Sequence, residues 1–598
     1  MKTSVCRTVA FVLAAVVWKS GALLAQAPPK IPGAIGYLKP EEVKPEIGKY
    51  GGRLVRDALG EPKSFNPITA GETSTSDFTD RMFQGMTSEN PWSGIIEGTL
   101  ASSWEVADDK MTWTFHLKHD ITFNDGTPMN ADDVIFSWND CIYDLSRPNP
   151  EKSEPRWPCS TRDIAQFQGK IFKVEKVDDY TVRVTTPVPI AILPRIAGAA
   201  VISKKKYAKF VADGTFGGAM ASDSKSEEIV GTGPWMLGSY TRGQNVTLKR
   251  NPNYWKKDAA GNKLPYLDEQ VWTITRDLNL MLVNFKQGTS DIYTLSSGKD
   301  VPELKRIEKQ DFKIYQLGPG HGMEFLSLNC NLDAAAQGKI PDWKAKLFGD
   351  TKFRKAISYA LDRPAMVRNI LRNLGYPQLA PTSVAPGPFF QEGFPAYPHD
   401  PEKAKQMLDE LGLKPGGDGI RVDAQGHPIS FTLTTNAGNT NREAYCDFIR
   451  KDLEQVGIRV NVLPLEFNAL IDKLDNTYDW EGVVMGFTGG WEPNDGANFW
   501  RSSARYHMWW PNQKTPRTAW EKEIDDIFDN ALQELDIAKR KTLYRRWTEI
   551  VRDEQPIVCL VINERCGALR DRFGNVMPSP WPESGKPMLQ LEEYVYVK

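Results

Sequence analysis

Three consecutive stretches decide the fold class: Ile429-Ser-Phe-Thr-Leu-Thr434, Arg442-Glu-Ala-Tyr-Cys-Asp-Phe-Ile-Arg-Lys-Asp-Leu-Glu-Gln-Val456 and Ile458-Arg-Val-Asn-Val-Leu463. The first and third alternate apolar with polar residues, as strands do, whereas the second repeats apolar residues at helical spacing. Gly457 follows the helical stretch as a C-terminal cap. A strand, a helix and a strand joined by short links predict a right-handed parallel crossover, and therefore an α/β fold.

The next apolar run, Gly482–Phe487, predicts a further strand that leads into the loop Phe487–Trp500, Phe-Thr-Gly-Gly-Trp-Glu-Pro-Asn-Asp-Gly-Ala-Asn-Phe-Trp. Open α/β sheets bind ligands beyond the C-terminal ends of their strands. Aromatic rings such as those of this loop cover the apolar faces of an organic ligand, and short polar side chains fix the orientation of the ligand. The alternative is a packed loop whose tryptophans are buried for stability. The candidate ligand-binding residues are Thr488, Gly490, Trp491, Glu492, Asn494, Asp495 and Trp500.

A second polar loop, Gly71–Thr75, follows the predicted strand Gly52–Ala58 and precedes a predicted helix. Loops beside a strand end can line a cleft, so Glu72 and Ser74 are also candidate ligand-binding residues. The alternative for both is an ordinary surface loop.

The composition is that of a soluble protein with several domains. The chain has 598 residues, and roughly 150 residues per domain gives about two to four domains. Hydrophobic residues make up 40% and charged residues 25%, which is ordinary for globular proteins and argues against disorder. The formal net charge of −2 lacks the basic excess of nucleic-acid-binding proteins, so we expect no nucleic-acid partner.

The N-terminus has the pattern of a secretory signal peptide. Lys2 and Arg7 form a basic start, Val9–Trp18 is a short apolar run, and small residues follow at Gly21–Ala27. The apolar run is about half the length of a membrane-spanning helix. We expect residues 1–25 to be removed and the mature protein to be periplasmic. No cysteine stands at the cleavage site, so no lipid anchor is expected.

Export into an oxidising compartment permits disulfides. Cys141–Cys159 and Cys559–Cys566 are the local pairs to test, although pairing does not follow from sequence. No CxxC motif is present to indicate zinc or redox chemistry.

Met111–Trp138 combines strand and helix signals. Trp113–Leu117 alternates as a half-buried strand, and Asn130 is placed to cap a helix with Asp132 and Asp133 in its first turn. Paired carboxylates can carry out acid–base chemistry, but capping and turn formation explain these acids without a catalytic role.

Several sequence blocks occur in a fixed order along the chain. They are Trp113-Thr-Phe-His-Leu, Phe123-Asn-Asp-Gly-Thr-Pro, Ala131-Asp-Asp-Val-Ile-Phe-Ser, Val230-Gly-Thr-Gly-Pro-Trp, Leu248-Lys-Arg-Asn-Pro-Asn-Tyr-Trp, Phe353-Arg-Lys-Ala-Ile-Ser-Tyr-Ala-Leu-Asp-Arg and Asp400-Pro-Glu-Lys-Ala-Lys-Gln-Met-Leu. Together they resemble the signature of the family 5 extracellular solute-binding proteins, the peptide, nickel and oligosaccharide receptors of ABC importers. The resemblance covers nearly all of Gly51–Lys598 and includes a late helix at Asp536–Ile550.

The resemblance implies an α/β fold like that of type II periplasmic binding proteins, with two lobes, a hinge and an extra subdomain in the first lobe. Solute would lie between the lobes, which close over it and present a surface to a membrane permease. Cys141–Gln168 is the expected insertion. The implied limits are 26–50 for a linker, 51–276 with 556–598 for the first lobe, 88–179 for the extra subdomain and 277–555 for the second lobe.

The resemblance also implies a ligand class. In the family's peptide binders an Asp in the loop after this strand pairs with the peptide's α-ammonium, and alignment on Gly486 puts Gly490 there. A buried ammonium without a carboxylate partner is costly, so either Glu492 or Asp495 replaces that Asp or the ligand lacks the charge.

We therefore expect a monomeric periplasmic receptor of an ABC importer that binds a peptide-like solute, delivers it to permease subunits and needs no cofactor. The alternative is a receptor for an oligosaccharide or another organic solute, because Trp491 and Trp500 would also suit stacking on a sugar ring.

Two other function classes have little support. A secreted hydrolase would be expected to show a GxSxG or HExxH motif, and neither is present, so we expect no enzyme. Nickel is disfavoured because His116 and His119, in a strand-and-turn region, do not share a helical face. The hypothesis for the site is that Trp491→Ala abolishes solute binding and leaves the fold intact.

Overall fold

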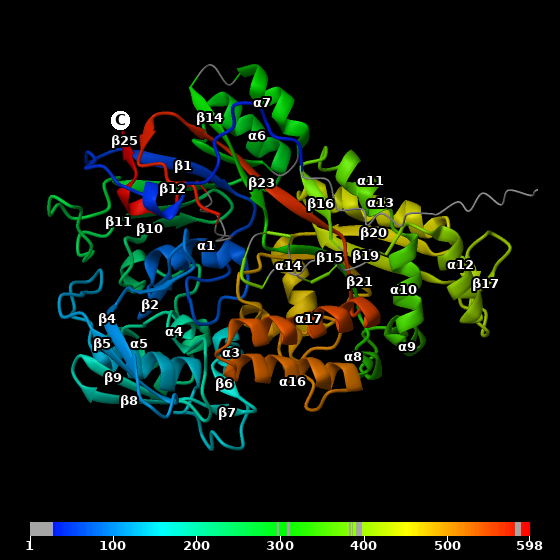
Figure 1. Ribbon diagram of the computed structural model, residues 1–598, viewed down its shortest axis with the longest axis horizontal. Coiled ribbons are helices and arrows are strands. Elements are labelled where there is room, and N and C mark those ends of the chain that lie inside the picture. The colour runs from blue at the N-terminus through cyan, green and yellow to red at the C-terminus, as the bar shows by residue number, and fades with distance from the viewer. Residues whose placement is uncertain are drawn as a thin grey trace, which may run out of the picture.

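The computed structural model describes residues 28–295, 298–307, 311–378, 380–381, 384–385, 387–389, 397–580 and 588–598. The expected signal peptide, residues 1–25, lies outside these residues. Two large sheets divide the molecule into a first lobe and a second lobe (Figure 1). No helix in the described ranges is long and apolar enough to cross a membrane.

The first lobe is built on an eight-stranded sheet with the order β10-β11-β12-β1-β13-β23-β14, and β16 pairs with β23. β1 pairs in parallel with β12, and most other neighbours are antiparallel. The strands are β1 (Arg53–Ala58), β10 (Trp235–Thr241), β11 (Asn245–Arg250), β12 (Glu269–Ile274), β13 (Ile292–Leu295), β14 (Phe312–Pro319), β16 (Gly375–Pro377) and β23 (Val561–Arg570). The helices of this lobe are α1 (Thr73–Met82), α4 (Leu193–Ile196), α5 (Lys204–Ala212), α6 (Leu278–Gln287) and α7 (Val301–Ile307).

The second lobe is built on a five-stranded sheet with the order β20-β19-β21-β15-β22. β19 and β20 are parallel and flank α13, which confirms the predicted crossover. The strands are β15 (Met323–Leu328), β19 (Ser430–Asn436), β20 (Arg459–Leu465), β21 (Gly482–Phe487) and β22 (Ile557–Cys559). The helices are α8 (Leu332–Ala336), α9 (Asp342–Gly349), α10 (Thr351–Ala360), α11 (Arg363–Asn369), α12 (Pro401–Glu410), α13 (Thr440–Glu454), α14 (Phe467–Asp472), α15 (Ala497–Trp500), α16 (Ala519–Gln533) and α17 (Ile537–Glu554).

A four-stranded sheet has the order β4-β5-β9-β8. Three of its strands fall within residues 88–179, the range expected for the extra subdomain, and β9 follows that range. Asn130 caps α2 as expected, since its side chain accepts a hydrogen bond from Asp132 N, and the helix continues as a π-helix over Phe136–Ile142. The elements are β4 (Ala101–Val106), β5 (Thr112–Leu117), β8 (Lys173–Asp178), β9 (Thr181–Thr185), α2 (Ala131–Ile135) and α3 (Ser160–Ile164). Short strand pairs are β2 (Thr87–Glu89) with β3 (Ile96–Gly98), β6 (Gln166–Phe167) with β7 (Lys170–Ile171), β17 (Lys414–Pro415) with β18 (Arg421–Val422), and β24 (Phe573–Gly574) with β25 (Tyr596–Val597).

The division between the sheets does not coincide with the expected lobe limit at residue 276. β13 and β14 follow that limit in sequence, yet they pair within the first-lobe sheet. The chain enters the smaller sheet between β14 and β15, at residues 320–322, and leaves β22 for β23 at Leu560. The described part of the expected linker also lies along the first lobe, where Ile35 bridges to Tyr315.

The cysteines do not form the disulfides that we considered. The six cysteines of the described ranges, which include Cys141, Cys159, Cys559 and Cys566, are free and buried. Their thiols pack in the interior as small apolar groups.

A buried ion cluster fixes the C-terminal segment to the first lobe. Glu592 pairs with Arg56 of β1 at 2.8 Å and with Arg81 of α1 at 2.7 Å, and all three side chains are almost fully buried. Gln270 also donates to Glu592 at 3.1 Å. Removing one member of a buried ion cluster leaves an uncompensated charge in the interior.

Glu592→Gln should therefore lower the free energy of unfolding by about 3–5 kcal/mol, measured by urea denaturation. Glu269→Gln is the control, because Glu269 forms a more exposed pair with Arg53 at 3.9 Å. Its loss should cost less than about 1 kcal/mol. Equal effects of the two substitutions would contradict a special role for the buried cluster.

Candidate functional site

The loop after β21 starts beside residues 320–322, where the chain passes from the first-lobe sheet to the second-lobe sheet. β21 ends at Phe487, opposite Met323 of β15. Gly489 has φ +67°, and a Cβ there would lie 2.1 Å from the carbonyl oxygen of His321. Only glycine fits this close approach, so Gly489 holds the loop against residues 320–322.

The carboxylate of Asp495 lies beside Gly490. A Cβ at position 490 would lie 2.8 Å from Asp495 Oδ2, so this carboxylate occupies the space next to a side chain at 490. Asp495 also pairs across the lobes with Arg195 of α4 at 3.3 Å, and Arg195 pairs with Glu89. Burial raises the pKa of Asp495 to about 7, the guanidinium of Arg195 opposes that rise, and the nearby carboxylates of Glu492 and Glu89 add to it.

Glu492, the other acid considered as a replacement, is directed into the second lobe. Its side chain is 6% exposed and pairs with Arg540 of α17 at 2.5 Å. The hydroxyl of Tyr544 donates to Glu492 Oε1 at 2.7 Å. Asn494 is buried beside it and donates to the same hydroxyl at 2.8 Å. Glu492 and Asn494 therefore anchor the loop to α17.

The two tryptophans of the loop have different environments. Trp500 is 3% exposed and packs among the rings of Phe499, Trp509 and Trp547 in the second-lobe core, as the alternative reading of the loop holds. Trp491 is partly exposed, and its indole N–H donates to His321 Nε2. Its ring lies against Gly94 of the first lobe, where a Cβ would lie 2.2 Å from it. Trp491 is therefore at the boundary between the lobes.

Thr488 is exposed at the start of the loop. Across the boundary, Glu72 accepts hydrogen bonds from Gly71 N and from Thr75 Oγ1, which stabilise the turn before α1. Ser74 is buried near Gly60, which also approaches the ring of Phe467 in α14. Among the described residues, the Ser74 hydroxyl has no hydrogen-bond partner.

Several residues at this boundary were not predicted from the sequence. Arg195 and Gly94 lie beside the loop, and Tyr506 lies so close to Gly71 that a Cβ there would be 1.6 Å from its hydroxyl oxygen. These residues are remote from the loop in sequence or lie beyond the quoted motif. No local pattern marks them, because only tertiary packing brings them together.

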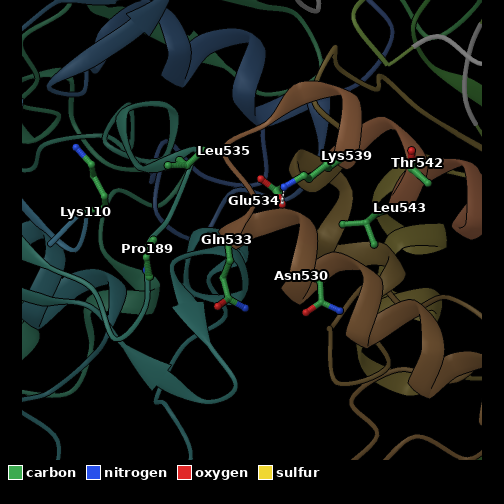
Figure 2. Close-up of a pocket in the computed structure, with 9 residues that line it drawn as sticks. All are labelled: Lys110, Pro189, Asn530, Gln533, Glu534, Leu535, Lys539, Thr542 and Leu543. Atoms are coloured by element: carbon green, nitrogen blue, oxygen red, sulfur yellow. Dashed lines mark ion pairs between the residues drawn. The ribbon is translucent and has the colours of Figure 1, made fainter. Parts of the chain in front are cut away.

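A surface hollow of about 690 Å³ opens at another part of the boundary (Figure 2). Lys110 and Pro189 come from the first lobe, and the other lining residues come from α16, α17 and their connection. Ala191, two residues after Pro189, donates its backbone N–H to Leu532 O of α16 at 2.9 Å. This hydrogen bond joins the first lobe to α16 next to the hollow. The predicted site residues do not line this hollow.

The histidines considered for nickel have other contacts. His116 pairs with Glu105 at 2.9 Å, and His119 stacks on Tyr180 with ring centroids 4.0 Å apart. Within the described ranges, no group of three or more His, Cys, Asp or Glu residues is arranged to hold a metal ion.

Trp500→Ala should lower the free energy of unfolding by about 3–5 kcal/mol, because it empties a well-packed position among aromatic rings. Chemical denaturation monitored by circular dichroism measures the change. Trp491→Ala, in the same loop, should cost less because its ring is partly exposed. A larger loss for Trp491→Ala would show that the packing of the loop is misassigned.

The raised pKa of Asp495 predicts a pH dependence of stability. A carboxyl whose pKa is raised by folding favours the folded state when protonated. That contribution is complete below its ordinary pKa of 3.8 and is lost as the pH rises through about 7. From pH 5 to pH 8, the wild type should therefore lose unfolding free energy relative to Asp495→Asn. Parallel pH profiles from urea denaturation would contradict this assignment.

Comparison with known proteins agrees with the two-lobed architecture. Residues 96–507 match the model of the bacterial extracellular solute-binding proteins, family 5. A probable ABC transporter-binding protein of Deinococcus radiodurans is 28% identical over 88% of this chain and 90% of the relative. The oligopeptide-binding protein AppA of Bacillus subtilis is 25% identical over 86% of this chain and 88% of its own.

Two solved structures show the same fold. The structure of Bacillus subtilis AppA in complex with a nonapeptide has a TM-score of 0.77 at 23% identity and covers 92% of this chain and all of that one. A periplasmic binding protein of Agrobacterium fabrum, MelB, in complex with stachyose also has a TM-score of 0.77, at 20% identity over 96% of each chain. The fold is therefore that of the type II periplasmic binding proteins, as predicted, and the chain belongs to the family 5 bacterial extracellular solute-binding proteins.

Proposed function

We propose that this chain is the periplasmic receptor of an ABC importer, that it binds a peptide-like solute between its lobes and that it delivers the solute to membrane permease subunits. Its family binds solutes, and relatives named for oligopeptides and dipeptides match most of its length. The expected export signal, the absence of a lipid anchor and the monomeric state belong to the same proposal.

The lobes are suited to hinged closure. We place the hinge at residues 320–322 and at Leu560, where the chain passes directly from a strand of one sheet to a strand of the other. β16, which lies between second-lobe helices in sequence, pairs with the start of β23 beside the second of these crossings. The Phe487–Trp500 loop begins at that hinge and faces Gly94 and Arg195 of the first lobe. Closure around these crossings would bury a solute held between the two sides.

The position of Asp495 supports a peptide as the solute. Position 490, which the family's peptide binders use for an ammonium-binding Asp, is glycine here, and the Asp495 carboxylate lies directly beside it. Asp495 is the acid that would replace the missing Asp, because its side chain is 33% exposed at the lobe boundary, whereas Glu492 is 6% exposed and paired with Arg540 in the interior. A peptide α-ammonium next to Asp495 would add a second cation beside the carboxylate that Arg195 already contacts.

Matched peptides with a free or an acetylated N-terminus test this role by titration calorimetry. The wild type should bind the free peptide about 100-fold more tightly, since acetylation removes the charge that Asp495 pairs with. Asp495→Asn should lose that preference, whereas Asp526→Asn, an exposed acid of α16 paired with Lys522, should keep it. The double substitution Gly490→Asp with Asp495→Asn should restore it by returning a carboxylate to position 490.

Proton release gives a second measurement. Burial raises the pKa of Asp495 to about 7, so this carboxyl is partly protonated near neutral pH, and an arriving ammonium would lower that pKa. Binding of the free peptide should therefore release protons, detected by calorimetry in buffers of different ionisation enthalpy. Equal affinity for both peptides, with no proton release, would contradict an ammonium-binding Asp495.

An oligosaccharide or another organic solute is the second candidate. The partly exposed ring of Trp491 at the lobe boundary favours it, because an exposed indole face can stack on a sugar ring. Under this alternative, Trp491→Ala would abolish binding while Asp495→Asn left it unchanged.

A further inference from the structure

One short segment of the expected insertion belongs to both lobes. Cys159, Ala165 and Phe167 are buried in the first-lobe core, whereas Ile164, between them in sequence, packs against the second-lobe core. α3, which ends at Ile164, lies against α15 of the second lobe, and Figure 1 shows it beside the α16 and α17 pair. The segment Ser160–Gln168 therefore spans the lobe boundary.

The base of this segment is fixed within the first lobe. Arg162 Nε donates to Ile142 O at 2.6 Å and Arg162 Nη1 donates to Trp157 O at 3.1 Å. The indole N–H of Trp157 in turn donates to Cys141 O at 2.7 Å. These bonds position α3 without help from the second lobe.

Polar contacts complete the connection to the second lobe. Arg501 Nη1 donates to Asp163 O at 3.2 Å. Burial at this contact raises the pKa of Asp163 to about 6, and the charges of Arg162, Arg501 and Arg505 oppose that rise.

The receiving surface of the second lobe is itself held in place. Arg501 pairs with Asp529 at 2.8 Å, and both side chains are largely buried. Ser502 N and Ser502 Oγ donate to the Asp525 carboxylate at 2.8 Å and 2.6 Å. Two preformed surfaces thus meet at α3. Figure 1 shows α3 apart from β15 and β23, the strands that directly follow the two crossings in sequence.

We propose that the segment Ser160–Gln168 is a latch that holds the lobes closed and sets how long a bound solute is retained. The retention of solute rests on the proposed function, whereas the holding of the lobes does not. Opening the lobes would expose Ile164 and separate Asp163 from Arg501 and Arg505, so this contact stabilises only the closed arrangement. Its loss shifts the equilibrium towards the open one.

Distances between labels on the two lobes test the latch. Lys209→Cys in the first lobe and Glu402→Cys in the second place thiols at positions whose side chains are 83% exposed, while the chain's own described cysteines are buried. Ile164→Ser in this background should shift the distances of the solute-free protein to longer values, measured by electron spin resonance. Ile171→Ser is the matched control, since Ile171 is an exposed isoleucine of the neighbouring β7.

The release of a synthetic nonapeptide with a free N-terminus gives the functional measurement. Ile164→Ser should speed its dissociation about tenfold, which corresponds to the loss of roughly two buried methylene groups. Ile171→Ser should release the peptide at the wild-type rate.

The two proposals fail in different ways. If the wild type binds no peptide, the distances between the labels still test whether the segment Ser160–Gln168 holds the lobes together. Ile164→Ala is a milder variant for use if Ile164→Ser does not fold. Distances in Ile164→Ser and Ile164→Ala that match those of the wild type and of Ile171→Ser would overturn the latch, whatever solute the protein binds.

Discussion

The close approach of Gly489 to the carbonyl of His321 is the constraint on which the site depends. It holds the loop after β21 against the residues through which the chain passes from one sheet to the other. From that fixed start the loop places Trp491 against the first lobe and Asp495 beside Gly490. A side chain at position 489 would displace the loop from the crossing, and the contacts with Gly94 and Arg195 would be lost with it.

The loop combines anchoring residues with residues at the lobe boundary. Glu492, Asn494 and Trp500 are buried in the second lobe, where Arg540, Tyr544 and Trp547 receive them. Trp491 and Asp495 project towards the first lobe instead. Anchoring by the first group fixes the position of the second, as the proposed solute-binding role of the loop requires.

The sequence predicted the fold more fully than the site. The strand–helix–strand pattern of residues 429–463 repeats regularly enough to identify β19, α13 and β20, and the apolar run Gly482–Phe487 coincides with β21. The pattern did not show that β13 and β14 join the larger sheet, because strand partners are chosen by tertiary packing. Nor did the pattern show that Asp495 points to the first lobe and Glu492 into the second. Asp495 is directed by Arg195 and Glu492 by Arg540, and both arginines are remote in sequence.

Native mass spectrometry of the protein purified from a periplasm tests the central claim most directly, because it releases the bound solute and measures its mass. A peptide receptor with Asp495 as its ammonium partner predicts a ladder of masses separated by amino-acid residues, each with a free amino group. Masses separated by hexose units, or a single non-peptide mass, would contradict it and make Trp491 the main contact of a different solute.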